Sequence, residues 1–204
     1  MGNKIELYGT VMSSFRFDHV CHGKNFYASL IAVKRESGVY DYLPIMGDEE
    51  IASVTEWEGK RVYINGSIRT FSEYGVKNSK LLIYIHIRQI ELLQDDVNDD
   101  NCVTLDGYFC KLPVYRKTPL GREIADLILA VNRPFGKSDY IPCICWGRHA
   151  RYVAVLKVGE HVLVRGRIQS RKYIKKLSEM EVEKRTAYEV SISEMEVTKD
   201  GKEN

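Results

Sequence analysis

Hydrophobic and polar residues alternate along most of this chain, and a period of two is typical of β-strands with one buried face. The alternation begins at 5–7 and again at 103–105, and both times it runs into a glycine. In each half the pattern predicts five short strands, with one helix between the third and the fourth. That order is typical of an OB-fold, a small Greek-key barrel. In the second half we expect strands at 103–105, 123–133, 140–146 and 162–173, a last strand that ends near Val197, and a helix at 148–156.

The chain contains the same pattern twice. The segment 3–9 returns at 101–107, an offset of 101 − 3 = 98, and Gly66 returns as Gly166, an offset of 166 − 66 = 100. A small change in offset indicates two copies of one fold with short loop insertions. The sequence therefore predicts an all-β protein made of two tandem OB-folds. Its expected parts are a diverged first OB-fold at 1–93, an acidic linker at 94–100, a second OB-fold at 101–197 and a disordered tail at 198–204.

The net charge of +2 becomes informative when the chain is divided. Residues 1–97 hold 11 Lys and Arg against 13 Asp and Glu, whereas residues 98–204 hold 19 against 15. The first half is therefore −2 and the second +4, so the second is the better candidate for an anionic partner. Five cysteines with no paired spacing, no signal-like start and no long apolar run favour a cytoplasmic protein of reduced thiols.

The predicted strand 162–173 carries the functional argument. Alternation sends Val162, Val164 and Ile168 toward the core and sends a row of three arginines to the opposite face. Such a row is either a solvated surface or a track for a phosphate backbone. Further cations in the same half favour the second interpretation. The predicted phosphate contacts are Arg116, Lys117, Arg133, Arg165, Arg167, Arg171 and Lys172.

Aromatic side chains are interleaved with these cations. The candidates lie on or beside the second, third and fourth strands of the second half. Any one of them could pack in the core, but as a group beside arginines they are typical of a surface on which bases stack. Stacking discriminates little among sequences, so the pattern predicts sequence-tolerant binding of single strands. The predicted stacking residues are Phe135, Tyr140, Trp146 and Tyr173.

Three segments of the second half are distinctive in combination. They read Pro113-Val-Tyr-Arg-Lys-Thr-Pro-Leu-Gly121, Ser138-Asp-Tyr-Ile-Pro-Cys-Ile-Cys-Trp-Gly147 and Val164-Arg-Gly-Arg-Ile-Gln-Ser-Arg-Lys-Tyr173. With 101–107 and 129–133, they resemble the bacterial single-stranded DNA-binding protein family, over about residues 101–197. The resemblance implies a bacterial nucleoid-associated protein that stacks bases on the same four aromatic residues.

The first half resembles a diverged member of that family. It keeps Tyr42 where the second half has Tyr140, but Asp48 stands where Trp146 would be. We therefore expect weaker DNA contact there and a role in dimerisation or partner binding. The alternative is a second stacking track that uses bases more than phosphates. Its residues would be Tyr42, Tyr63, Arg69, Phe71 and Tyr74.

Partners follow from the same resemblance. Bacterial members of the family usually end in an acidic tip that recruits other proteins, whereas this chain ends Val197-Thr-Lys-Asp-Gly-Lys-Glu-Asn204. Recruitment of replication or repair proteins would then run through another surface, for which the first OB-fold is the candidate, or through another protein. Members with one barrel usually form tetramers, so two chains with two barrels each would supply four. A homodimer is the expected assembly.

The function predicted from the sequence is coating and protection of single-stranded DNA in replication, recombination or repair. One alternative is a primosome or recombination accessory protein whose OB-folds mainly bind protein. Another is a single-stranded RNA binder, because stacking and charge do not distinguish the two nucleic acids. No catalytic constellation is found, and no cofactor is expected. His19, Cys21 and His22 lack a second ligand pair at zinc spacing, so no metal site is predicted.

Overall fold

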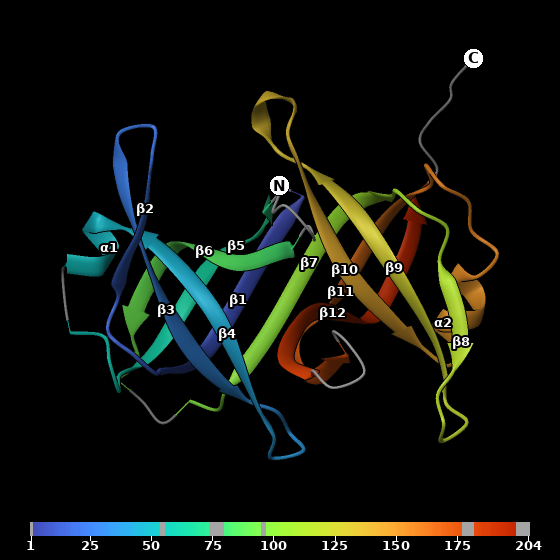
Figure 1. Cartoon of the computed structure of the whole chain (residues 1–204), viewed down its shortest axis with the longest axis horizontal. Helices are drawn as coiled ribbons and strands as arrows, with labels where there is room; N and C mark the ends of the chain where they lie inside the picture. The colour runs from blue at the N-terminus through green and yellow to red at the C-terminus, as the bar shows by residue number, and fades with distance from the viewer. Residues whose placement is uncertain (1, 54–55, 74–79, 95–96, 177–181, 199–204) are drawn as a thin grey trace.

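The computed structural model describes residues 2–53, 56–73, 80–94, 97–176 and 182–198. Two barrels lie side by side, and β1 and β7 run through the middle of the molecule (Figure 1). Each barrel is an OB-fold, as the strand pattern predicted. The first is built from β1 (Asn3–Val11), β2 (Arg16–Cys21), β3 (Lys24–Lys34), β4 (Tyr40–Asp48), α1 (Glu49–Ser53), β5 (Arg61–Glu73) and β6 (Lys80–Leu92).

The second barrel repeats this order with one short 3-10 turn added. Its short strand β8, like β2 in the first barrel, is a sixth strand that the five-strand expectation omitted, because its exposed residues do not alternate. The helix expected at 148–156 ends early, since its last turn tightens into bonds such as Leu156 N–H to the Val153 carbonyl. The elements are β7 (Asp100–Phe109), β8 (Val114–Lys117), β9 (Glu123–Asn132), η1 (Pro134–Gly136), β10 (Ser138–Trp146), α2 (Arg148–Val153), β11 (His161–Lys176) and β12 (Val182–Thr198).

The twelve strands found among the described residues form one hydrogen-bonded sheet. Its order is β2-β3-β4-β6-β5-β1-β7-β11-β12-β10-β9-β8, and the extra pairings β1–β3 and β7–β9 close the two barrels. The order reads as one half followed by its mirror image, so the two halves are related by an approximate two-fold axis. The halves join where β1 pairs antiparallel with β7, with Ile5 opposite Val103. Among the described residues, no helix is long and apolar enough to cross a membrane.

The core confirms the alternation that opens each half. Ile5 and Leu7 are fully buried, as are Val103 and Leu105. β11 needs a glycine because it bulges between Arg165 and Gly166. A Cβ at Gly166 would lie 2.1 Å from the Ser191 carbonyl oxygen, closer than any side chain allows. The bulge bends the long strand β11, which pairs with both β7 and β12.

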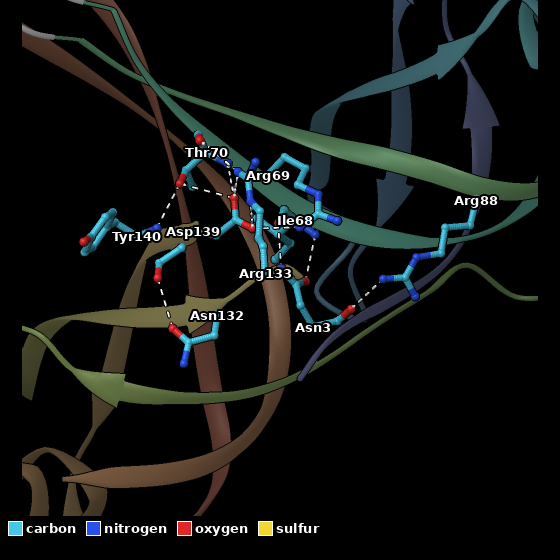
Figure 2. Close-up of polar contacts among 10 residues, drawn as sticks. Asn3, Ile68, Arg69, Thr70, Arg88, Asn132, Arg133, Asp139 and Tyr140 are labelled. Carbon is cyan, nitrogen blue, oxygen red and sulfur yellow. Dashed lines mark hydrogen bonds and ion pairs between the residues drawn. The ribbon is translucent and has the colours of Figure 1, made fainter. Parts of the chain in front are cut away.

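A buried carboxylate of the second half holds a strand of the first (Figure 2). Asp139 on β10 is fully buried, and it accepts the backbone N–H of Thr70 on β5 at 2.7 Å. It also forms ion pairs with Arg133 of its own half and with Arg69 of the first. The Thr70 hydroxyl accepts the backbone N–H of Tyr140 at 2.9 Å. These bonds fix the β9–β10 hairpin against the first barrel.

The approximate two-fold axis repeats this arrangement on the other side. Asp41 on β4 is 1% exposed and accepts the backbone N–H of Ser170 on β11 at 2.7 Å. Arg35 binds Asp41 through Nε and Nη2 at 2.7 and 2.6 Å. The Ser170 hydroxyl oxygen accepts the backbone N–H of Tyr42 at 3.3 Å. The β3–β4 hairpin of the first half is therefore fixed against β11 of the second.

Candidate nucleic-acid interface

An open groove of about 560 Å³ runs over the outer face of the second half. Strands β9 to β12 and the loop before β9 form most of it, and one residue of the first half completes it. Five arginines line the groove, against a single carboxylate. Its residues are Arg35, Arg116, Thr118, Arg122, Ile124, Ile144, Trp146, Arg167, Gln169, Ser170, Arg171 and Glu189.

The predicted row on β11 enters this groove only in part. Arg167 and Arg171 line it, whereas Arg165 is exposed and is not among the lining residues. Gln169 is buried and donates to Glu189 at 2.9 Å, and Arg171 lies 3.6 Å from the same carboxylate. Glu189 therefore balances one of the arginines.

Arg167 differs from Arg35 and Arg116 of the same groove in the direction of its pKa shift. Burial lowers the pKa of Arg167, and the nearby guanidinium of Arg35 lowers it further. Two cations that destabilise each other in a partly buried groove favour an anion between them. A phosphate would relieve that repulsion.

Arginines from the β8–β9 hairpin form the outer wall of the groove. Arg116 pairs with Asp126 at 2.6 Å, and this bond raises the pKa of Arg116. The pair is solvent-exposed, so it contributes little stability, and Arg116 can exchange Asp126 for a phosphate at small cost. Lys117 and Lys172 are exposed cations outside the lining residues.

Trp146 is the one predicted stacking residue that lines the arginine groove. Its ring is 38% exposed, and its Nε1 donates to the Ser191 hydroxyl at 3.3 Å. Apolar side chains of Ile124 and Ile144 line the groove with it. The hydrogen bond holds one edge of the indole ring, which leaves the exposed part of the ring available to a base.

The other three predicted stacking residues lie elsewhere. Phe135, fully exposed with a positive φ of 66°, lies on the β9–β10 hairpin, which projects beyond the sheet (Figure 1). Tyr140, half-exposed, lies on the same hairpin beside Thr70 of the first half. Tyr173 lines a second groove, of about 570 Å³, together with Pro44 and other residues of both halves. The four rings therefore have separate environments and do not form one cluster.

Arg133 is a different case from the other predicted phosphate contacts. Its guanidinium binds Asp139 and donates to the Thr70 carbonyl at 3.2 Å. It lies 5.5 Å from the centre of the Phe71 ring, and it is not a lining residue of the arginine groove. Arg133 thus joins the two halves, and the interface proposed below does not include it.

The same region of the first half is built from different chemistry. Strand pairing places Asp48 opposite Phe26, as Trp146 is opposite Ile124. Phe26 stacks on His19 at 5.2 Å, and its ring centre is 6.0 Å from that of His86. Burial lowers the pKa of His86, which favours a neutral ring.

The residues of the predicted secondary site have separate environments. Tyr42 and Phe71 are exposed, whereas Arg69 is paired with Asp139 across the interface between the halves. The Tyr63 hydroxyl donates to Glu6 at 2.9 Å. Tyr74 lies outside the described residues. The predicted secondary site therefore offers exposed rings, and its one arginine is already paired with a carboxylate.

Sequence reasoning missed two arginines of the groove, Arg122 and Arg35. Arg122 follows the glycine of a hairpin loop. The acidic neighbour Glu123 kept it from being recognised as part of a basic cluster. Arg35 is the counterpart of Arg133 at the offset of 98, so the repeat could have identified it. The repeat alone, however, does not reveal that Arg35 reaches the other half.

Two barrels joined through a shared sheet define a tandem OB-fold protein, and its second half carries a groove lined by arginines and Trp146. The single-strand binding protein family model matches residues 100–198. The second half of the chain is therefore similar to that family.

Curated relatives agree with the family match. The single-stranded DNA-binding protein of Halalkalibacterium halodurans is 42% identical over 80 residues, which cover 36% of this chain and 48% of the relative. The single-stranded DNA-binding protein A of Bacillus subtilis is also 42% identical over 80 residues, covering 36% and 46%. The chain thus spans about half the length of the curated relatives it matches.

A solved structure matches both halves in fold. The wild-type single-stranded DNA-binding protein from Thermus aquaticus has a TM-score of 0.74 at 22% identity, over 98% of this chain and 94% of that one. A deletion mutant of the same protein gives a TM-score of 0.77 at 20% identity, over 97% and 95%. The likeness supports the tandem OB-fold architecture of the whole chain.

Proposed function

We propose that this protein binds single-stranded DNA through the arginine groove, and so coats and protects it in replication, recombination or repair. The observation that carries the proposal is the convergence of Arg35, Arg116, Arg122, Arg167 and Arg171 on one groove that also contains Trp146. Arginines can neutralise the phosphates of a strand, and an indole can stack a base whatever its identity. The proposed role requires no catalytic step.

Single strands fit this groove better than duplexes do. A duplex hides the faces of its bases, so it would gain the electrostatic contribution alone and lose stacking on Trp146. A competition titration tests this directly. Labelled oligo-dT bound to the full chain is displaced by unlabelled oligo-dT, by oligo-rU and by duplex of the same length. We expect oligo-dT to compete best, and duplex to compete more weakly. Better competition by oligo-rU would favour the RNA alternative.

The assembly is part of the proposal. We infer a homodimer, because two chains with two OB-folds each present four barrels, and closed two-fold symmetry is the commonest arrangement of homo-oligomers.

The first half has the composition for a second role, in contact with replication or repair proteins. It carries a net charge of −2 over residues 1–97, and Phe17 and Val20 on β2 are exposed apolar residues. Exposed apolar side chains in a half of net negative charge fit a protein partner better than a phosphate backbone.

A further inference from the structure

Arg35 belongs to the first half by sequence and to the groove of the second half by position. It follows β3, yet it lines the groove with Arg167 and Arg171 of β11. Its Nη2 donates to the Ser170 carbonyl at 3.3 Å, and its partner Asp41 holds the Ser170 N–H. The hairpin that carries Arg35 is therefore anchored to the strand that forms the groove.

The arginine keeps donors for a further partner. Its bonds to Asp41 and Ser170 use Nε and Nη2, so Nη1 is not used in them. The side chain is 23% exposed, and a guanidinium presents five N–H donors in a rigid fork. Asp41 is buried and holds the guanidinium through two bonds, which fixes the position of Arg35 at the groove.

The charge around Arg35 also favours an anion. Glu189 is the one carboxylate among the lining residues, and it already accepts a bond from Gln169 and lies beside Arg171. Arg35 and Arg167 are close enough for the first to lower the pKa of the second. A phosphate oxygen between the two guanidinium groups would accept bonds from both.

We propose that Arg35 of the first half contacts a phosphate of the strand bound in the second half, so the DNA site is composite and neither half contains it alone. This inference rests on the proposed function and assigns a specific role to the one groove arginine that belongs to the first half. It revises the simple division in which the second half supplies all phosphate contacts. The first half contributes a cation even though its net charge over residues 1–97 is −2.

The approximate two-fold axis supplies a matched control. Arg133 makes the same bonds as Arg35, to Asp139 and to the Thr70 carbonyl. Near it, however, β5 carries Phe71 at the position where β11 carries Arg171, by the offset of 100. Replacing either arginine removes the corresponding pair with a buried aspartate, and the urea midpoints account for the second partner, Arg69, that Asp139 keeps. Only Arg35→Ala also removes a cation from the groove.

The experiment measures oligo-dT affinity of the full chain at several salt concentrations. Wild type is compared with Arg35→Ala, Arg133→Ala and Arg167→Ala, and urea midpoints report the structural cost of each change. We expect Arg35→Ala and Arg167→Ala each to reduce the slope of log K against log salt by about 0.7. Arg133→Ala should keep the wild-type slope. Should Arg35→Ala not fold, Arg35→Gln takes its place, because it can still donate to Asp41 but carries no charge.

The outcomes separate two failures. A slope for the Arg35 variant equal to that of Arg133→Ala, with a reduced slope for Arg167→Ala, would overturn the composite site and leave the proposed function standing. A wild-type affinity that does not depend on salt would instead contradict the proposed function itself. Retention of the slope by Arg35→Lys would support a role for the charge, since that change breaks the fork to Asp41 and keeps the cation.

Discussion

The backbone N–H of Thr70 donates to Asp139 at 2.7 Å, and so joins β5 of the first half to β10 of the second. The distance between Ser170 N and Asp41, on the other side of the approximate two-fold axis, is also 2.7 Å. Two buried carboxylates thus hold each half against a strand of the other. The β1–β7 pairing adds a continuous sheet between them. The two OB-folds consequently form one body.

The buried carboxylate should be necessary for stability. Asp139→Ala leaves Arg133, Arg69 and the Thr70 N–H without their partner, and breaking a buried pair costs about 3–5 kcal/mol. Urea unfolding of the full chain measures the loss. Asp126→Ala, which breaks the exposed pair with Arg116, is the control and should cost about 0–1 kcal/mol. Equal losses for the two variants would contradict the role given to Asp139.

Stability should fall in acid through Asp41. Burial by itself would raise its pKa, but bonds from Arg35 and Ser170 more than offset burial, and the pKa of Asp41 lies below its usual value. A lowered pKa contributes stability that is present above the unfolded value, roughly pH 4, and is lost as pH falls through the folded value. Urea midpoints between pH 7 and about pH 3 should therefore decrease. Asp41→Asn should decrease less over the same interval; an unchanged pH dependence in this variant would assign the acid sensitivity to other groups.

Trp146 should contribute stacking and no charge. Trp146→Ala is expected to weaken oligo-dT binding by roughly 1–3 kcal/mol without changing the salt slope. Trp57 is the second indole of the chain and is buried in the first half, so Trp57→Phe leaves the fluorescence of Trp146 alone. In that background, bound DNA should quench the remaining fluorescence, because a base stacks on Trp146. Normal binding by Trp146→Ala, with only a lower melting temperature, would make this residue a packing residue.

The assembly is tested by mass. Light scattering of the purified chain at micromolar concentration should give the mass of two chains, in agreement with four OB-folds in the particle. This mass is expected without DNA, since the proposed dimer forms through protein surfaces. The mass of a single chain would rule out the homodimer.

Much of the fold can be predicted from the sequence, because burial enforces alternation. Ile5, Leu7, Val103 and Leu105 have to face a core, and the repeat at offsets of 98 and 100 identifies the second barrel. The short strands β2 and β8 were missed because their residues are exposed. Burial imposes no pattern on such residues.

The site could be predicted less completely. Charge and spacing identified Arg116, Arg167, Arg171 and Trp146, which line one groove. The position of Arg35 depends on how the two halves pack, and that contact joins residues 135 positions apart in the chain. The pattern within one strand holds no information on a partner so distant in sequence.

The central claim is that the arginine groove binds a single strand by neutralising its phosphates. The most direct test is the salt dependence of oligo-dT binding by the full chain and by the double variant Arg167→Ala, Arg171→Ala. For wild type, we expect log K to fall linearly with log salt, with a slope of about −0.7 for each phosphate contacted. For the double variant, the slope should be smaller by about 1.4, which is two such contacts. An identical slope for the two proteins would contradict the claim.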